Sequence, residues 1–298
     1  MTVLDPVAEA LLHSPDEAVQ PATSGQAKTD SPQLVRIKPK RLARQGLPRP
    51  LRRAIGPLAV LLIWELASAS GLLPQDVLAG PAVVVASASK LLATGELQQA
   101  ILVSLGRAAA GLAIGGSVAV VLAILSGLFR LGEDLIDSTM QMLRTMPIVA
   151  LIPLLIIWFG IGEKPKIALI ALATAFPLYL NVYAGIRNVD QKLVEVGLTL
   201  GLSRAALVWN VVLPGALPNA LIGLRYSLGV AWLALVFGEQ INASAGIGYL
   251  MNTGRELFQT DVIVVCLVVY ALLGLIVDAF VRFLERVLLS WRPSFTGT

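Results

Sequence analysis

Long apolar runs alternate with short polar stretches over most of the chain, from about residue 55 to residue 288. The hydrocarbon core of a bilayer is about 30 Å thick, so a helix needs about 20 mostly apolar residues to cross it. Six runs approach that length and predict an all-α membrane protein with six transmembrane helices. These runs cover residues 55–73, 104–128, 141–160, 166–186, 217–241 and 262–288.

The stretch 187–216, between the fourth and fifth runs, is too polar and too short to span and predicts two short amphipathic helices. Asp190 is placed to cap the first helix, and Gly201 is placed to end it with a positive φ angle. Ser203 can cap the second helix, and Pro214 is expected to prevent its smooth continuation. Apolar residues share one face of each helix, at Leu193, Val196 and Leu200 in the first and at Leu207, Val208 and Val211 in the second.

Two features inside the apolar runs bear on helix packing. The second run carries a small residue at every fourth position, which lets helix backbones approach closely in lipid. Glu65 lies near the middle of the first run and is expected to face protein, either as a structural contact or as a coupling charge. The small residues of the second run are Gly111, Gly115, Ala119, Ala123 and Gly127.

Residues 1–54 lack apolar periodicity and predict a disordered tail that is acidic first and basic afterwards. The basic block directly precedes the first run, which favours a cytoplasmic N-terminus. Six crossings then return the short tail 291–298 to the cytoplasm, and residues 55–290 form the membrane domain between the two tails. A nucleic-acid-binding tail and a cleaved signal peptide are the alternatives. Leaders do not normally carry so long a stretch of mixed charge before their apolar core.

Composition favours lipid as the solvent of this chain. Of its 298 residues, 56% are hydrophobic and 14% are charged, and the mean hydropathy is +0.77. Soluble domains carry about 25% charged residues. The single cysteine, Cys266, and the single histidine, His13, argue against a disulfide, a metal site and a membrane-embedded enzyme. No Gly-x-x-x-x-Gly-Lys-Ser/Thr loop is present, so no cofactor is expected and any ATP must be bound elsewhere.

The 187–216 stretch resembles the signature loop of ABC-importer permeases, Glu-Ala-Ala, three residues, Gly, nine residues, Ile-x-Leu-Pro. Valine and glycine replace the two alanines here, and Val211 replaces the isoleucine. The resemblance implies a coupling helix that docks on an ATPase subunit, with Glu195 at the contact and Gly201 at the turn. The spacing is intact at Glu195, Val196, Gly197, Gly201, Leu213 and Pro214.

Other segments are similar to the branch of that family importing sulfonates, taurine, nitrate or bicarbonate, and the aliphatic sulfonate permeases look closest. The resemblance covers about residues 55–290. It implies a multi-pass protein of the bacterial inner membrane that works with a second permease copy, an external solute-binding protein and ATPase subunits that bind ATP and Mg²⁺. A small anionic solute is implied, and no nucleic acid. The segments include Trp158 to Gly162, Phe176 to Asn181, Ala231-Trp232, Glu239-Gln240 and Gly246 to Leu250.

Polar side chains inside spans are candidates for the solute pathway. Arg225, near the inner end of the fifth run, is instead expected to extend to the cytoplasmic interface. Asp278 is placed to pair with Arg282, four residues further on. The pathway candidates are Arg107, Trp232, Glu239 and Gln240.

A secondary transporter driven by an ion gradient is the alternative function. Such transporters usually contain inverted repeats with broken helices. No internal repeat stands out in this sequence, and the 187–216 hairpin would have no role in such a protein. Dependence of uptake on ATP rather than on an ion gradient separates the two functions.

Overall fold

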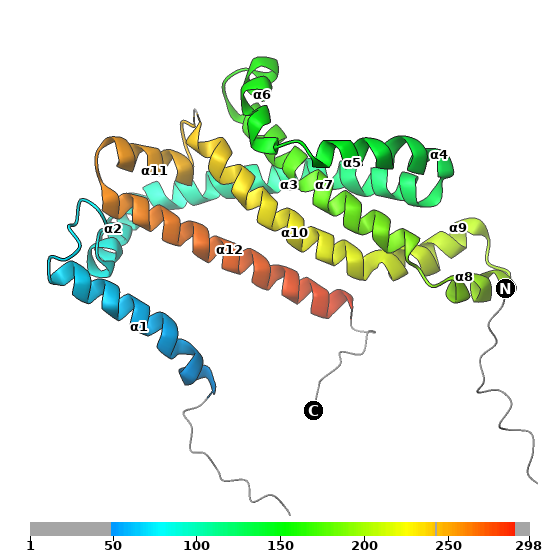
Figure 1. The fold of residues 1–298 in the computed structure, drawn as a ribbon, viewed down its shortest axis with the longest axis horizontal. Helices are drawn as coiled ribbons and strands as arrows, with labels where there is room; N and C mark the ends of the chain where they lie inside the picture. The colour runs from blue at the N-terminus through cyan, green and yellow to red at the C-terminus, as the bar shows by residue number, and fades with distance from the viewer. Residues whose placement is uncertain (1–48, 242, 290–298) are drawn as a thin grey trace, which may run out of the picture. The chain divides into compact units, whose positions relative to one another are not determined.

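The computed structural model describes residues 49–289 except residue 242, and these residues form helices and turns without a β-strand (Figure 1). The predicted tails, with His13, fall largely outside this range, although residues 49–54 belong to the first helix. The α-helices are α1 (Arg49–Ala69), α2 (Pro81–Thr94), α3 (Glu96–Leu128), α4 (Arg130–Gly132), α5 (Ser138–Arg144), α6 (Ile152–Phe159), α7 (Glu163–Arg187), α8 (Gln191–Thr199), α9 (Arg204–Leu207), α10 (Leu213–Gln240), α11 (Ile247–Glu256) and α12 (Thr260–Leu288). Between them lie two π-helical segments, η1 (Glu133–Asp137) and η3 (Val208–Val212), and the 3₁₀ segment η2 (Ile148–Leu151).

Among the described residues, four helical segments are long and apolar enough to cross a membrane: α3, α7, α12 and the continuous stretch Arg204–Gln240. The number rises to five if the bent pair Arg130–Arg144 and Ile148–Phe159 counts as one span. The apolar part of α1, Ile55–Ala69, is shorter than a span normally requires. An all-helical membrane fold is therefore confirmed, with fewer full-length spans than the six predicted.

The third predicted span, 141–160, is not one straight helix. Its two halves meet at an angle of 93° (Figure 1). Pro147 lies at the break, with a ψ angle of 102° that belongs to extended backbone. A proline disfavours helical geometry at the residue before it and has no N–H to donate, so it favours a break where no neighbour enforces continuity. The hydropathy of the sequence does not predict that change of direction.

Helix α7 lies at the centre of the packing, between α3 and α10 (Figure 1). The ladder of small residues on α3 faces α7, and the close approach of helices that the sequence predicts is found there. A Cβ atom built on Gly111 would lie 2.5 Å from Cγ2 of Ile170, and one built on Gly115 would lie 2.1 Å from the carbonyl oxygen of Ala171. Ala119 and Ala123 are fully buried beside α7 residues. The missing side chains thus let the backbones of α3 and α7 touch.

Replacing Gly115 with alanine is expected to destabilise the protein by about 1–3 kcal/mol, the usual cost of overpacking a close contact. The new methyl group would meet backbone rather than a movable side chain. Gly106→Ala is the matched control, because Gly106 lies on the same helix and a Cβ atom added there would have nothing within 4 Å. Both substitutions gain similar helix propensity. Equal thermal unfolding midpoints in detergent would contradict the close packing of Gly115 on α7.

Glu65 of α1 makes a structural contact. Its Oε2 accepts a hydrogen bond of 3.0 Å from the backbone N–H of Ala82, in the first turn of α2. A helix start has N–H groups without partners, so a carboxylate there is well placed. Pro81 begins α2, where its missing N–H costs nothing and its fixed φ suits the first helical position. The contact joins α1 to α2.

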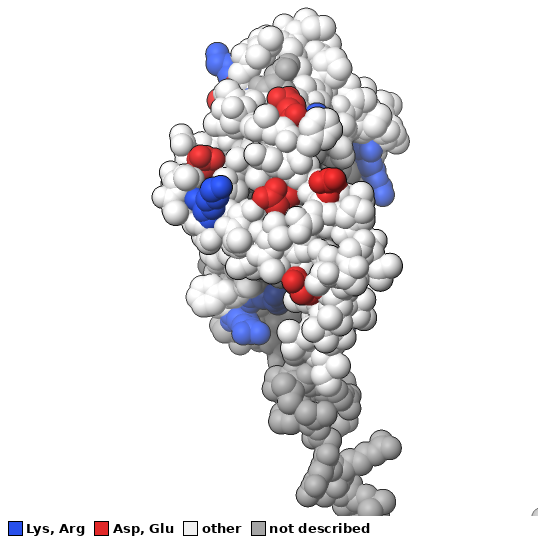
Figure 2. Space-filling model, turned by 90° about the vertical axis from the view of Figure 1, so that its left-hand side faces the viewer, with Lys and Arg blue, Asp and Glu red and all other residues white. Residues whose placement is uncertain are grey.

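Charged residues are sparse on the surface that Figure 2 shows. Acidic and basic side chains form separate spots on an otherwise uncharged face of the molecule. A nucleic-acid-binding surface carries clustered lysine and arginine. On the face in view no such cluster is present.

Candidate functional site

The 187–216 hairpin has the local structure that its sequence predicts. Asp190 caps α8, since its Oδ1 accepts a 2.9 Å hydrogen bond from the N–H of Lys192. Gly201 ends the helix with φ +78°, and the next N–H, of Leu202, donates to the carbonyl of Gly197 at 3.1 Å. Ser203 caps the second helix by accepting from the N–H of Ala206 at 3.3 Å. Both ends of the turn are therefore fixed by hydrogen bonds.

The regular α-helical pattern is interrupted before Pro214, but the helix does not end there. The helix continues from Arg204 through Gln240, a length of 37 residues. The π-helical segment η3 lies directly before Pro214, and the N–H of Leu213 donates to the carbonyl of Val208, five residues back. The wider π turn accommodates a proline that has no N–H and whose ring would crowd the preceding turn. The hairpin is thus continuous with the span α10.

Gly197 is buried in the contact between the two helices of the hairpin. A Cβ atom at this position would lie 2.7 Å from Cδ1 of Leu207 and 3.3 Å from Cδ1 of Leu202. Glycine at this point lets α8 pack tightly on the second helix. An alanine here, as in the permease signature, would require the side chains of Leu207 and Leu202 to shift.

An apolar face of α8 is left uncovered. Leu193, Val196 and Leu200 are 55%, 56% and 77% exposed, respectively. Glu195 is exposed on the same helix, as is Pro214 at the start of α10, whereas Leu213 is half-buried. Exposed apolar side chains of this kind mark a surface that another protein or lipid covers. The predicted coupling residues therefore lie on an accessible hairpin.

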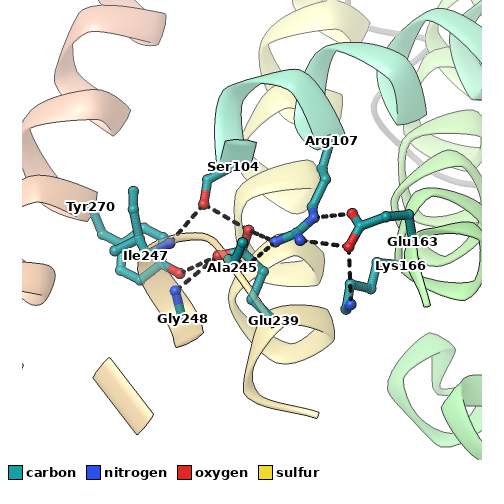
Figure 3. Close-up of polar contacts among 9 residues, drawn as sticks. All are labelled: Ser104, Arg107, Glu163, Lys166, Glu239, Ala245, Ile247, Gly248 and Tyr270. Carbon is teal, nitrogen blue, oxygen red and sulfur yellow. Dashed lines mark hydrogen bonds and ion pairs between the residues drawn. The ribbon is translucent and has the colours of Figure 1, made fainter. Parts of the chain in front are cut away.

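Arg107 and Glu239, from two different predicted spans, meet in the protein interior (Figure 3). Nη1 of Arg107 lies 2.6 Å from Oε1 of Glu239, and the two side chains are 3% and 0% exposed. The same Nη1 donates to the carbonyl of Ala245 at 2.7 Å. The guanidinium also forms a two-pronged ion pair with Glu163 of α7, through Nε and through Nη2. The positive charge of Arg107, inside a membrane helix, is thus paired with two carboxylates.

Glu239 has no free acceptor position. Besides Arg107, its carboxylate accepts from Oγ of Ser104 at 2.6 Å, from the N–H of Gly248 at 2.9 Å and from the hydroxyl of Tyr270 at 3.0 Å. Oγ of Ser104 in turn accepts from the N–H of Ile247 at 2.9 Å. The carboxylate therefore holds the start of α11 against α3, α10 and α12 (Figure 3).

We call Ser104, Arg107, Glu163, Lys166, Glu239 and Tyr270 the Arg107–Glu239 network. It lies at the end of α10 farthest from the 187–216 hairpin. Lys166 joins through Glu163, with Nζ and Oε1 3.4 Å apart. The sequence identified only Arg107 and Glu239. The presence of one arginine inside a span does signal that acidic partners exist, but it does not say which helices supply them.

Trp232 and Gln240 lie outside this network. Nε1 of Trp232 donates to the carbonyl of Tyr270 at 3.0 Å, and its ring packs edge-on against that of Tyr270. Gln240 is exposed, and its backbone carbonyl accepts a hydrogen bond from Nδ2 of Asn252 at 2.9 Å. The structure thus brings two of the four pathway candidates together and separates the other two. Their contact with a solute stays a prediction.

Three known proteins with similar sequences are all transport permease proteins. Over 239 residues, 80% of this chain and 91% of the relative, the chain is 48% identical to the permease protein SsuC of Escherichia coli (strain K12), which is named for aliphatic sulfonates transport. It is 39% identical over 274 residues to SsuC of Bacillus subtilis (strain 168), covering 92% of this chain and 98% of that protein. Identity to the taurine transport system permease protein TauC of Escherichia coli is 35% over 256 residues, 83% of this chain and 92% of TauC.

The fold also matches a solved structure. The crystal structure of an amino acid ABC transporter with histidines superposes with a TM-score of 0.55 at 17% identity, covering 66% of this chain and 96% of that chain. At this identity the match supports the fold alone. Residues 115–289 match the family described as binding-protein-dependent transport system inner membrane component. The chain belongs to this family, and it is a multi-pass permease subunit of the inner membrane rather than an enzyme.

Proposed function

We propose that this permease carries aliphatic sulfonates, or similar small anions, in an importer driven by separate ATPase subunits. Two relatives named for aliphatic sulfonates and one named for taurine support the solute class. Taurine is itself a short sulfonate, so the three names share one head group. An external solute-binding protein would deliver the anion, and ATP with Mg²⁺ would be bound by the ATPase.

We propose the 187–216 hairpin as the ATPase contact. The observation that carries this assignment is the uncovered apolar face of α8 on a hairpin continuous with α10. Hydrogen bonds at both ends of the turn, from the N–H of Leu202 to Gly197 and from the N–H of Ala206 to Ser203, make the hairpin a stiff element. A helix of 37 residues measures about 55 Å at 1.5 Å per residue. A displacement at α8 can therefore pass through its contact at Gly197 and Leu207 to this long helix, and along that helix to Glu239 of the Arg107–Glu239 network.

The proposed arrangement has six crossings with both termini in the cytoplasm. The short helix α1 and the bent α5–α6 pair supply the two crossings that are not straight, full-length spans. The hairpin then lies on the cytoplasmic side, and the Arg107–Glu239 network lies near the outer side. A second copy of the chain, related by a two-fold axis, completes the pathway between the two subunits.

A secondary transporter is the function to be distinguished by experiment, although membership of a binding-protein-dependent family counts against it. The purified permease, its ATPase and its binding protein are reconstituted in proteoliposomes with radiolabelled ethanesulfonate. Uptake is expected only with ATP on the hairpin side and with binding protein on the other side. Collapsing ion gradients with an ionophore should leave uptake unchanged. Uptake that follows an ion gradient without ATP would overturn the importer, and ATP-driven vesicles inactive with any sulfonate would overturn the solute class.

A further inference from the structure

A groove of about 260 Å³ runs between α10 and α12, away from the Arg107–Glu239 network. Arg225 and Trp232 contribute to it from α10, and they lie seven residues, or about 10 Å, apart on one helix face. From α12 it is lined by Gly274, Val277 and Asp278. An arginine, an aspartate and an indole thus lie along a mostly apolar groove. This is the composition of a site for a molecule with a charged head and an apolar tail.

The charged groups at the groove balance one another. Nη2 of Arg225 lies 2.6 Å from Oε2 of Glu285, and its Nε lies 3.7 Å from Oδ1 of Asp278. Asp278 also pairs with Arg282, as the i,i+4 spacing predicts. Arg225 therefore does not simply extend to the membrane surface as its sequence position suggests. Four charged side chains at one opening are costly in hydrocarbon, so this opening lies outside the hydrocarbon core of the membrane.

Arg225 remains accessible within its ion pairs. Its side chain is 42% exposed, whereas that of Arg107 is 3% exposed. A guanidinium has five N–H donors and accommodates a planar or tetrahedral anion in place of a carboxylate. An incoming sulfonate can therefore exchange with Glu285 without leaving the arginine unpaired. Arg107, enclosed by Glu163 and Glu239, offers no such exchange.

Two glycines leave space in the groove. Gly229 lines the groove from α10, and nothing lies within 4 Å of a Cβ built there. At Gly274 the nearest atom to such a Cβ is Nε1 of Trp232, at 3.9 Å. Neither glycine is required by backbone contact, unlike Gly115 on α3. Side chains at these positions would occupy the groove rather than disturb helix packing.

We propose that this groove is a transit site for the transported anion, with the head group on Arg225 and the alkyl chain along Gly229, Trp232 and Gly274. The inference rests on the proposed sulfonate function and adds a position and an orientation for the solute. Exchange with a neighbouring carboxylate makes the site weak. A transport site must release its cargo, so weak binding suits it.

Charge variants test the head-group contact in the reconstituted importer, with ethanesulfonate as the probe. Arg225→Gln is expected to lower uptake about tenfold or more, since it removes a charge-assisted hydrogen bond. Glu285→Gln is expected to lower the KM for uptake, because it removes the competitor for Arg225. If the pair were only structural, the two variants would impair uptake alike, and that result would overturn the proposal. Arg286→Gln, one residue from Glu285, removes one positive charge outside the groove lining and should leave uptake unchanged.

Filling variants test the alkyl contact and do not depend on the ion pairs. Gly229→Leu is expected to abolish uptake of octanesulfonate while retaining part of the uptake of ethanesulfonate. Gly106→Leu is the control on α3, where a Cβ also has nothing within 4 Å. Equal uptake of both sulfonates by Gly229→Leu and the parent would overturn the proposed path.

The controls separate failure of the transit site from failure of the proposed function. Membrane abundance and ATP hydrolysis are measured for each variant to exclude loss of assembly. If the parent importer carries no sulfonate, the proposed function fails. If the parent carries sulfonate and both Arg225→Gln and Gly229→Leu match it, the transit site fails and the function stands.

Discussion

Glu239→Ala is expected to destabilise the protein by about 3–5 kcal/mol, the usual cost of breaking a buried ion pair by removing one partner. Glu239 is fully buried and accepts hydrogen bonds from Ser104, Arg107, Gly248 and Tyr270. Alanine would leave each of those donors without this acceptor in an apolar interior. We expect little protein to accumulate in the membrane. The apparent unfolding midpoint of what is recovered in detergent should fall by many degrees.

A double-mutant cycle tests whether the pair with Arg107 causes that loss. Glu239→Gln and Arg107→Gln each leave one buried charge partly compensated, whereas the double variant leaves neither charge. The double variant is therefore expected to be more stable than the sum of the single effects implies. Strict additivity would show that the two residues act independently. Arg187→Gln is the control, because Arg187 pairs with Glu133 on the surface and such pairs contribute about 1 kcal/mol or less.

Val196→Asp is expected to abolish co-purification of the ATPase and ATP-driven uptake while leaving the permease folded. Val196 is more than half exposed on α8, so a carboxylate there is hydrated in the free chain. In a docked complex the same carboxylate would be buried without a partner, at a cost of several kcal/mol. A loss of about 3 kcal/mol in docking corresponds to about a hundredfold weaker binding. Pull-down of the ATPase on immobilised permease measures the effect.

The matched control for this prediction lies on the same helix. Gln191→Glu also adds one negative charge, on a different side of α8 and in its first turn, where an acidic residue is favourable. It should retain the ATPase. Equal retention by both variants would remove α8 as the docking surface, and equal loss would point to a general charge effect instead.

Local structure could be predicted from the sequence alone where it depends on residues that are close together in the chain. Asp190, Gly201 and Ser203 cap the hairpin as predicted, because each cap is completed within a few residues. The small-residue ladder on α3 likewise predicted a close helix contact, although not that α7 would provide it. The fold class followed from hydropathy, since each apolar run must find either lipid or another helix.

Predictions were incomplete where the outcome depends on the path of the chain. Pro214 was expected to prevent the smooth continuation of a helix, and a π-helical segment before it lets the helix run on. The apolar run around Pro147 was predicted as one span, and its two halves meet at an angle of 93°. A proline is compatible both with a helix that continues past it and with a sharp bend between two helices. Which one occurs is decided by the packing available to the residues on either side, and hydropathy does not contain that information.

The sequence by itself determined that this protein is helical, lies in a membrane and presents a capped amphipathic hairpin with the spacing of an ABC-permease signature. Only the tertiary structure decided that Arg107 pairs with Glu239 and Glu163, that the hairpin is continuous with α10, and that Arg225 opens onto a groove. The physical reason is the separation, along the chain, of the residues that interact. Caps and apolar periodicity are completed within a few residues of one another, whereas a buried charge is satisfied by whichever helix packs beside it. Arg107 and Glu239 lie 132 residues apart in the chain, and no local pattern joins them.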